Sequence, residues 1–397
     1  MTDTCRKAYK YKLDPTPAQV EKLDWTLWRC RELYNAALAE RKEAWRMQQV
    51  SIGYYAQKRD LPAIKELRPE YKDIHAHVLQ DVIKRVELTY QAFFRRIQAG
   101  EKAGYPRFQG RTRYHSLTYA EYGNGVMLNG GILWLSKIGR VIIRLHRPLD
   151  GTPKTVTISR EADGWYACIS CTHVPRQPLP LTGVETGMDV GLTSFLALAD
   201  GAFIENPRHY RKTEKALKHA QRRVSRRKKG SNRRCKAVRL LARKHQKVAR
   251  ARRDFHHKTA LCLVRQYDAI YHEAIQAKNL SARPLPKPDG KGGYLPNGAS
   301  QKAGLNKSIH DAGWSQFLTI LACKAAYAGK RVEAVPPAYT SQDCSGCGER
   351  VPKSLSVRTH ICPSCGLVLD RDTNAALNIL WAGQARQGAL AVAGVLN

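Results

Sequence analysis

The N-terminal run at residues 5–13 alternates loosely between basic side chains and aromatic or apolar ones. Such alternation is typical of a strand with one solvated face. A helix is expected directly after it, because Thr16 can cap the helix, Pro17 can occupy its first position and Gln19 can complete a capping box. The apolar face of that helix would consist of Val20, Leu23, Leu27, Cys30 and Tyr34.

A second amphipathic helix is predicted over residues 77–99, ended by glycines. Its apolar stripe consists of Val78, Val82, Val86, Tyr90, Phe93 and Ile97. We interpret the aromatic members as core residues and not as residues that stack on bases. Between residues 106 and 174, short apolar runs are separated by Gly, Asn, Asp and Pro, which predicts a small antiparallel sheet or barrel.

A proline-rich segment at residues 175–181 predicts the main domain boundary, and the pattern beyond it is mixed α/β. Residues 188–199 are strand-like and turn through Asp200-Gly201, residues 267–272 are strand-like again, and residues 309–327 predict one helix. Residues 281–306 contain too many Gly and Pro for a regular element, so we expect a mobile loop there.

Charge changes the picture, because 67 Lys and Arg against 33 Asp and Glu give a net charge of +34. Between residues 211 and 253, twenty basic residues accompany one acid, Glu214, and Gly230-Ser-Asn232 divides the stretch into two helices. A thin apolar stripe remains at Leu217, Val224, Val238, Leu241 and Val248. A solvated face would mix charge signs, so this excess of one sign predicts binding to nucleic-acid phosphates.

A membrane location is not expected, because no segment offers the roughly 18 consecutive apolar residues of a membrane-spanning helix. The N-terminus lacks the apolar region of a secretory signal, so we expect the reducing cytoplasm, where disulfides are unlikely.

Four of the eleven cysteines are grouped as two CxxC pairs, and each pair is followed by glycine. The members are Cys344, Cys347, Cys362 and Cys365. Two such knuckles predict a tetrahedral zinc site. Since four thiolates leave no open coordination position, the zinc would be structural.

Three acids stand at the ends of strand-like segments or just beyond the cysteines: Asp189, Glu273 and Asp372. Each alone is typical of a surface or capping carboxylate. Together they form a plausible hard-oxygen cluster for two Mg²⁺ ions that hydrolyse a phosphodiester.

Several motifs, in this order, resemble the TnpB family of insertion-sequence proteins. They are Tyr9-Lys-Tyr-Lys-Leu-Asp-Pro-Thr-Pro-Ala-Gln19, Tyr34-Asn-Ala-Ala-Leu38, Gly187-Met-Asp-Val-Gly191, Ala312-Gly-Trp314, Ala338-Tyr-Thr-Ser-Gln-Asp-Cys344 and Asp370-Arg-Asp-Thr-Asn-Ala-Ala376. The resemblance spans nearly the whole chain and extends to small type V CRISPR effectors.

The resemblance implies an α+β multidomain fold: an N-terminal wedge β-barrel with an inserted helical recognition lobe, then an RNase H-like (RuvC) nuclease with an inserted Cys₄ zinc domain. The expected parts are residues 1–14 and 106–180 for the barrel, 15–105 for the recognition domain, 181–337 for the nuclease with basic helices at 205–258, 338–368 for the zinc domain, and 369–397 for the completion of the nuclease.

The resemblance also implies an RNA-guided DNA endonuclease of the prokaryotic nucleoid, with a guide RNA from the transposon end and double- and single-stranded target DNA as partners. Asp189, Glu273 and Asp372 would be its Mg²⁺-binding catalytic acids, with Asp370 as a neighbouring candidate. In the family the second acid usually stands in a Glu-Asp-Leu context, whereas here Ala and Ile follow Glu273. No small-molecule cofactor is expected.

Other functions remain open from the residues alone. The basic surface and zinc knuckles would equally serve a catalytically silent guided repressor or DNA-binding regulator. A self-contained transposase or an RNA-binding accessory protein is the third possibility. Retained acids separate the nuclease from the repressor, and a co-purifying RNA would separate it from the third class.

Overall fold

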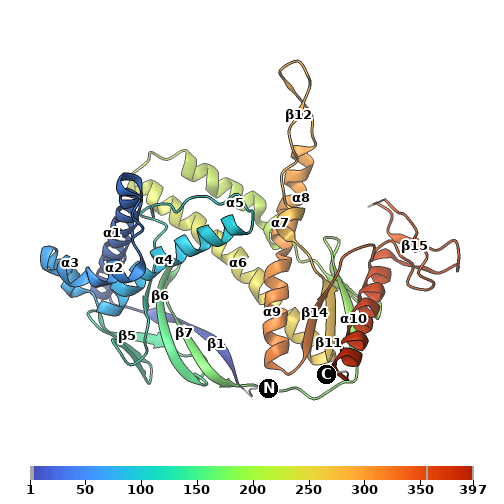
Figure 1. Cartoon of the computed structure of the whole chain (residues 1–397), viewed down its shortest axis with the longest axis horizontal. Helices are drawn as coiled ribbons and strands as arrows, with labels where there is room; N and C mark the ends of the chain where they lie inside the picture. The colour runs from blue at the N-terminus through green and yellow to red at the C-terminus, as the bar shows by residue number, and fades with distance from the viewer. Residues whose placement is uncertain (1–3, 355, 396–397) are drawn as a thin grey trace. The chain divides into compact units, whose positions relative to one another are not determined.

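The computed structural model describes residues 4–354 and 356–395, and the chain divides into two compact units, residues 1–175 and residues 176–397. Figure 1 shows the elements of both units along the chain. Among the described residues, no helix combines the length and apolar character needed to cross a membrane.

The first unit is a curved antiparallel sheet accompanied by helices. Its strands are β1 (Thr4–Asp14), β2 (Ser116–Tyr119), β3 (Val126–Asn129), β4 (Ile132–Leu135), β5 (Gly139–Arg144), β6 (Thr152–Glu161) and β7 (Gly164–Pro175). They are ordered β2-β6-β7-β1-β5-β4-β3 in a nearly closed barrel. Since β1 pairs with both β7 and β5, the N-terminal strand completes a sheet built from residues more than a hundred positions later.

The helices of this unit are α1 (Pro17–Gln48), α2 (Tyr54–Arg59), α3 (Leu61–Leu67) and α4 (Ala76–Gln98), with a 3₁₀ turn at Pro69–Asp73. The predicted start of α1 is confirmed, because the Thr16 hydroxyl accepts a hydrogen bond from the backbone N–H of Gln19 and the Gln19 side-chain oxygen accepts one from the backbone N–H of Thr16. The predicted stripe of α4 is only half right. Val78, Val82 and Val86 are buried and Tyr90 and Phe93 are half-buried, but Ile97 is 49% exposed.

The second unit contains a five-stranded sheet ordered β10-β9-β8-β11-β14. Its strands are β8 (Glu185–Val190), β9 (Ser194–Leu198), β10 (Phe203–Glu205), β11 (Ala269–Glu273) and β14 (Arg331–Val335). Strand β9 runs antiparallel to its neighbours β8 and β10, whereas β11 is parallel to both β8 and β14. This arrangement is that of an RNase H-like domain, which confirms the fold class.

Helices cover both faces of this sheet. The helices of the second unit are α5 (His209–Ser225), α6 (Asn232–Gln266), α7 (Ala277–Leu280), α8 (Ala299–Ala312), α9 (Trp314–Tyr327) and α10 (Arg371–Val395). One face is the main core, where Met188 and Ile270 of the sheet pack with Leu263 of α6 and Phe317 of α9. On the other face, α10 lies against β8 and β11 (Figure 1). Two short hairpins, β12–β13 (Lys287–Pro288 and Tyr294–Leu295) and β15–β16 (Thr359–Ile361 and Val368–Asp370), complete the unit.

Three sequence predictions in this unit are wrong in detail. The single strand at 188–199 is two strands, because a turn at residues 191–193 reverses the chain. The single helix at 309–327 is α8 and α9, separated at Gly313, whose φ of 67° is the left-handed conformation that ends a helix. The segment predicted as a loop at 281–306 contains the β12–β13 hairpin and the start of α8. Asp289 closes the hairpin turn by accepting hydrogen bonds from two backbone N–H groups.

The basic stretch forms the two predicted helices, and Ser231 caps α6 by accepting a hydrogen bond from the backbone of Arg234. The predicted apolar stripe is only partly buried. Leu217, Val224 and Val248 face the interior, whereas the Val238 side chain is 43% exposed.

Candidate metal centres and nucleic-acid interface

Asp189 and Glu273 lie at the carboxyl ends of neighbouring parallel strands. The register pairs Met188 of β8 with His272 of β11, so the two acids occupy the next position on adjacent strands. Met188 points into the main core and is fully buried. Because side chains alternate along a strand, Asp189 and Glu273 point to the opposite face, where α10 packs.

Helix α10 brings the third acid to the same edge of the sheet. It approaches β8 so closely that a Cβ atom on Gly187 would lie 2.0 Å from the carbonyl oxygen of Ala376. This contact explains the glycine of the Gly187-Met-Asp motif. Asp372 lies in the first turn of α10, and one of its oxygens is 4.0 Å from the Cβ position of Gly191 at the end of β8. The three predicted acids therefore converge.

Electrostatics shows that the acids are coupled. Burial, followed by the charges of Glu273 and Asp372, raises the pKa of Asp189 to about 8. Burial also raises the pKa of Glu273. Three partly buried carboxylates repel one another, and a divalent cation with hard-oxygen preference would relieve that repulsion. The carboxylate donors fit Mg²⁺. Among the described residues, the four cysteines are the one group of metal-binding side chains whose ligand atoms lie close together, and the three carboxylates are farther apart.

Two side chains missed by sequence reasoning hold these acids. Thr340 donates a hydrogen bond from its hydroxyl to the Glu273 carboxylate. Arg358 donates to Asp372 at 3.3 Å and also to the Thr193 hydroxyl in the turn after β8. Both lie in the segment around the cysteines, so that segment contacts the carboxylate site directly.

The start of α10 is fixed by polar contacts to the same segment. The buried Asn374 accepts a hydrogen bond from the backbone of Ser345 at 2.9 Å and donates to the carbonyl of Asp343 at 2.8 Å. Asp370, the neighbouring candidate acid, accepts hydrogen bonds from the backbone N–H groups of Asp372 and Thr373. Asp370 is thus the N-cap of α10, a structural role that occupies its carboxylate.

The four predicted cysteines come together as a tetrad. The Sγ atoms of Cys344 and Cys365 are 3.6 Å apart, those of Cys347 and Cys362 are 3.5 Å apart, and all four lie within 4.8 Å of one another. Zinc–sulfur bonds of about 2.3 Å in a tetrahedron place sulfurs roughly 3.8 Å apart, so the geometry fits zinc. Backbone N–H groups in the second knuckle lower the pKa of Cys362 to about 6, whereas hydrogen bonds with the neighbouring thiols raise the pKa of Cys347.

The basic helices begin at a buried acid that the sequence did not reveal. Asp311 of α8 accepts hydrogen bonds from the backbone N–H groups of Tyr210 and Arg211 at the start of α5, and an ion pair from Arg252 of α6 at 3.1 Å. Its side chain is 4% exposed. Helix α5 has no cap of its own, so Asp311 supplies one from a distant helix and joins three helices.

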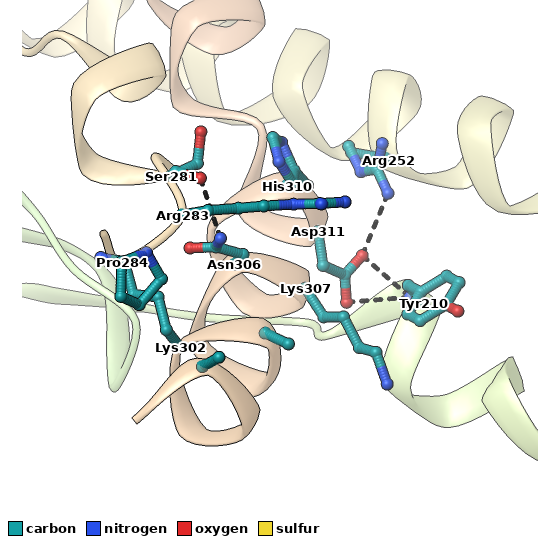
Figure 2. A pocket seen from close by; sticks show the side chains of 12 residues that line it. Tyr210, Arg252, Ser281, Arg283, Pro284, Lys302, Asn306, Lys307, His310 and Asp311 are labelled. Carbon is teal, nitrogen blue, oxygen red and sulfur yellow. Dashed lines mark hydrogen bonds and ion pairs between the residues drawn. The ribbon is translucent and has the colours of Figure 1, made fainter. Parts of the chain in front are cut away.

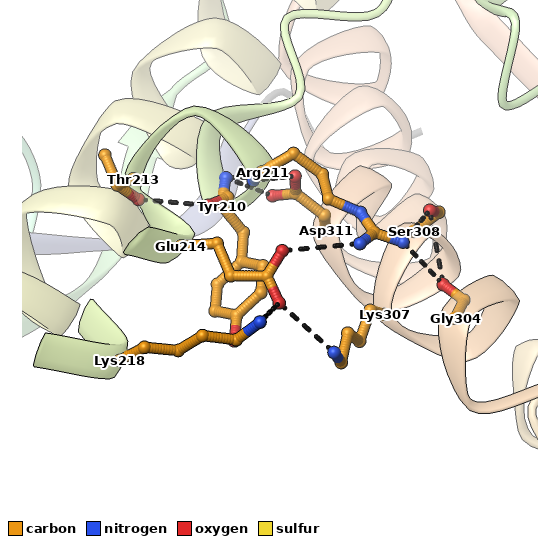
Figure 3. Close-up of polar contacts among 9 residues, drawn as sticks. All are labelled: Tyr210, Arg211, Thr213, Glu214, Lys218, Gly304, Lys307, Ser308 and Asp311. Carbon is orange, nitrogen blue, oxygen red and sulfur yellow. Dashed lines mark hydrogen bonds and ion pairs between the residues drawn. The ribbon is translucent and has the colours of Figure 1, made fainter. Parts of the chain in front are cut away.

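Beside this junction, Glu214 neutralises only a small part of the basic charge. Figure 3 shows it between Arg211, Lys218 and Lys307. Hydrogen bonds from Lys307 and Lys218 lower the pKa of Glu214 to about 2, so it stays ionised. Most of the remaining cations of α5 and α6 lie on exposed faces, as expected of a surface that binds phosphates.

A cavity of about 770 Å³ opens at the same place (Figure 2). Its cationic lining comes from Arg252, Arg283, Lys302 and Lys307. A second cavity shares Asp311 and extends past Arg208 to Thr193. Thr193 lies in the turn after β8, and Arg358 donates a hydrogen bond to its hydroxyl. This second cavity therefore reaches the turn that Arg358 ties to Asp372.

Sequence reasoning named the seven candidate ligands but not the residues that contact them. Thr340 and Asn374 lie inside motifs that resemble the family, which was the one available signal. Arg358 and Asp311 carry no signal in the sequence, because their roles depend on contacts between distant segments.

Comparison with family models gives three matches. Residues 168–283 match the model described as "Probable transposase", residues 314–379 match the "Cas12f1-like, TNB domain", and residues 1–49 match a "Helix-turn-helix domain". Over the described part of that last range, the structure has one strand and one long helix.

Similar proteins extend over nearly the full chain. A protein of Streptomyces pristinaespiralis, provisionally named an RNA-guided DNA endonuclease, is 33% identical over 97% of this chain and 91% of its own length. InsQ of Escherichia coli K12, with the same provisional name, is 32% identical over 96% of this chain and 92% of its own length.

A similar fold occurs in the cryo-EM structure of a Cas12f1–sgRNA–target DNA complex. The TM-score is 0.54 at 13% identity, and the alignment covers 91% of this chain and 82% of the other. This likeness shows a shared fold. The full-length sequence matches show more: the chain belongs to the TnpB family of transposon-encoded proteins.

Proposed function

We propose that this protein is an RNA-guided DNA endonuclease that hydrolyses DNA with Mg²⁺ held by Asp189, Glu273 and Asp372. The observation that carries the proposal is the convergence of these acids from β8, β11 and α10 at one sheet edge. The relatives of similar length are named as RNA-guided DNA endonucleases, which supports the same activity here.

Each part of the site has a defined task in this proposal. Asp189 and Glu273 hold the cation from the sheet, and Asp372 holds it from α10. Mg²⁺ bound there would activate water and stabilise the leaving oxygen of the phosphodiester. Thr340 orients the Glu273 carboxylate, and Arg358 fixes Asp372 against the turn after β8. Such outer contacts set the orientation of metal ligands.

Specificity would come from a guide RNA, because base pairing reads the target while the protein reads a short duplex motif. We assign that guide to the transposon end and the motif to DNA next to the transposon. The basic faces of α5 and α6 would bind the phosphates of guide or target without sequence preference.

The domain roles follow the same plan. Residues 1–14 and 106–180 would form the wedge barrel and 15–105 the recognition domain. Residues 181–337 and 369–397 would form the nuclease, and 338–368 the zinc domain that contacts nucleic acid. Zinc on the cysteine tetrad would hold the fold of this last segment, since the tetrad leaves no position for a reacting ligand.

The test is expression with the native flanking DNA, recovery of bound RNA, and cleavage of guide-matched DNA with and without Mg²⁺. The wild type is compared with Asp189→Asn, which keeps the shape of the side chain and removes its charge. Guide-dependent cutting that the variant loses supports the proposal. Bound RNA and target binding without cutting in the wild type would indicate a guided repressor, and the absence of any bound RNA would refute guidance.

A further inference from the structure

The first unit contains an aromatic cavity that lies outside the nuclease unit. It has a volume of about 350 Å³, within the range typical of small-ligand pockets. Its walls come from α1, α4, the segment between α1 and α2, and the segment after α4. The aromatic rings in the walls belong to Trp45, Tyr90, Phe93, Phe94 and Tyr105.

Several of these rings are exposed to solvent although they are large and apolar. Trp45 is 53% exposed, Phe94 54% and Tyr105 42%. The rings are also ordered among themselves, since Tyr90 stacks on Phe94 with a centroid distance of 6.3 Å and Tyr105 meets the edge of Tyr90 at 5.9 Å. A contiguous exposed aromatic wall of this kind marks a binding site more often than a core.

The charged side chains that line this cavity are Arg41 and Glu87, which form an ion pair, and the buried Arg41 is incompletely satisfied. Arg41 of α1 is 6% exposed. Its Nε donates to Gln57 at 2.7 Å and one terminal nitrogen donates to Glu87 at 2.7 Å. Its other terminal nitrogen is buried and has no hydrogen-bond partner in the described structure. An unsatisfied buried guanidinium donor is costly, so the cavity favours a ligand with an acceptor.

We propose that this cavity binds an unpaired nucleobase, with its ring against the aromatic wall and an exocyclic carbonyl oxygen accepting a hydrogen bond from Arg41. A nucleobase combines a flat stacking face with carbonyl acceptors on its edge, which matches both features of the site. The proposal concerns binding in the first unit and is independent of the nuclease chemistry.

Charge at the rim favours a nucleotide over an apolar peptide. Lys42 lies 5.6 Å from the ring centre of Tyr105 and 5.0 Å from that of Phe108. Its ammonium group is therefore close enough to the aromatic wall to contact a phosphate attached to a bound base. The whole chain carries a net charge of +34, which also favours a polyanion.

The test measures binding of single strands of equal length to the full-length chain freed of bound RNA. The probes are oligothymidine, oligouridine and an abasic deoxyribose-phosphate strand, and fluorescence anisotropy gives each Kd. The abasic strand keeps the phosphates and therefore the counterion release, so it isolates the contribution of the base. The variants are Trp45→Ala and Phe94→Ala, both at exposed positions, and Trp134→Ala at a 42% exposed position on β4 is the control.

Because base stacking on aromatic side chains contributes to affinity, we expect Trp45→Ala and Phe94→Ala each to bind the base-containing strands about 5- to 100-fold more weakly than the wild type. The same two variants should bind the abasic strand as the wild type does, and Trp134→Ala should affect the binding of no probe. Phe94→Trp keeps an aromatic ring and should retain the wild-type affinity. A loss with oligothymidine alone identifies DNA as the source of the base, and a loss with oligouridine alone identifies RNA. Equal losses on the abasic strand, or no loss on any strand, would overturn the proposal.

Discussion

The Thr340 hydroxyl donates a hydrogen bond to the Glu273 carboxylate, which links the segment before the cysteine knuckles to the end of β11. We predict that Thr340→Val lowers Mg²⁺ affinity or cleavage about 10- to 100-fold, because the carboxylate loses its orienting partner. The measurement is the Mg²⁺ dependence of the cleavage rate. Thr340→Ser keeps the hydroxyl and should retain the wild-type response; equal defects in both variants would contradict the orienting role.

Asp189 should reduce the stability of the metal-free protein as pH rises. Its pKa is raised to about 8, so the folded state keeps a proton that the unfolded chain releases near its ordinary pKa of about 4. The penalty on folding therefore grows between about pH 4 and pH 8. We expect Asp189→Asn to raise the Tm by several degrees at pH 8, and by less at pH 5, in Mg²⁺-free buffer without chelator. An equal gain at both pH values would exclude this linkage.

Loss of one zinc ligand should affect the carboxylate site as well as the tetrad. Cys362→Ser is expected to reduce bound zinc from about one per chain to near zero and to lower the cleavage rate, because Asn374 ties α10 to the first knuckle. Metal analysis and the cleavage assay measure the two effects. Cys235→Ser, at an exposed free cysteine outside the tetrad, is the control and should change neither.

Asp311 should be a major determinant of stability in the second unit. Asp311→Ala leaves two backbone N–H groups of α5 and the Arg252 guanidinium without their acceptor, which predicts a loss of roughly 2–4 kcal/mol in the free energy of unfolding. Denaturant unfolding measures it. The exposed ion pair of Asp254 with Lys258 gives the comparison, since Asp254→Ala should cost below about 1 kcal/mol.

The parts of the fold that the sequence predicted are those determined by local chemistry. The start of α1 was predictable because Thr16, Pro17 and Gln19 form the cap among themselves. The cysteine tetrad was predictable because its spacing carries the geometry of a metal knuckle. The three acids were singled out by their places at the ends of strand-like segments or just beyond the cysteines, and then by resemblance to a family. Their convergence depends on strand register that no local pattern contains.

The errors arose where tertiary contacts override a local pattern. Gly313 was taken as an interior helix position, but its left-handed backbone separates two helices and packs against Arg252. Ile97 fits the apolar stripe of its helix, yet the described chain leaves it exposed. Periodicity shows that a face is apolar and does not show what covers it.

Asp370 and Asp372 provide the most direct test of the assigned carboxylate site, because they are two positions apart in the chain and are assigned different roles. Asp370 caps α10, and Asn is an equally good cap, so Asp370→Asn should cut guide-matched DNA at close to the wild-type rate. Asp372→Asn should bind guide and target but lose cutting by several orders of magnitude. Retained cutting in Asp372→Asn, or an equal loss in both variants, would contradict the assignment of the carboxylate site.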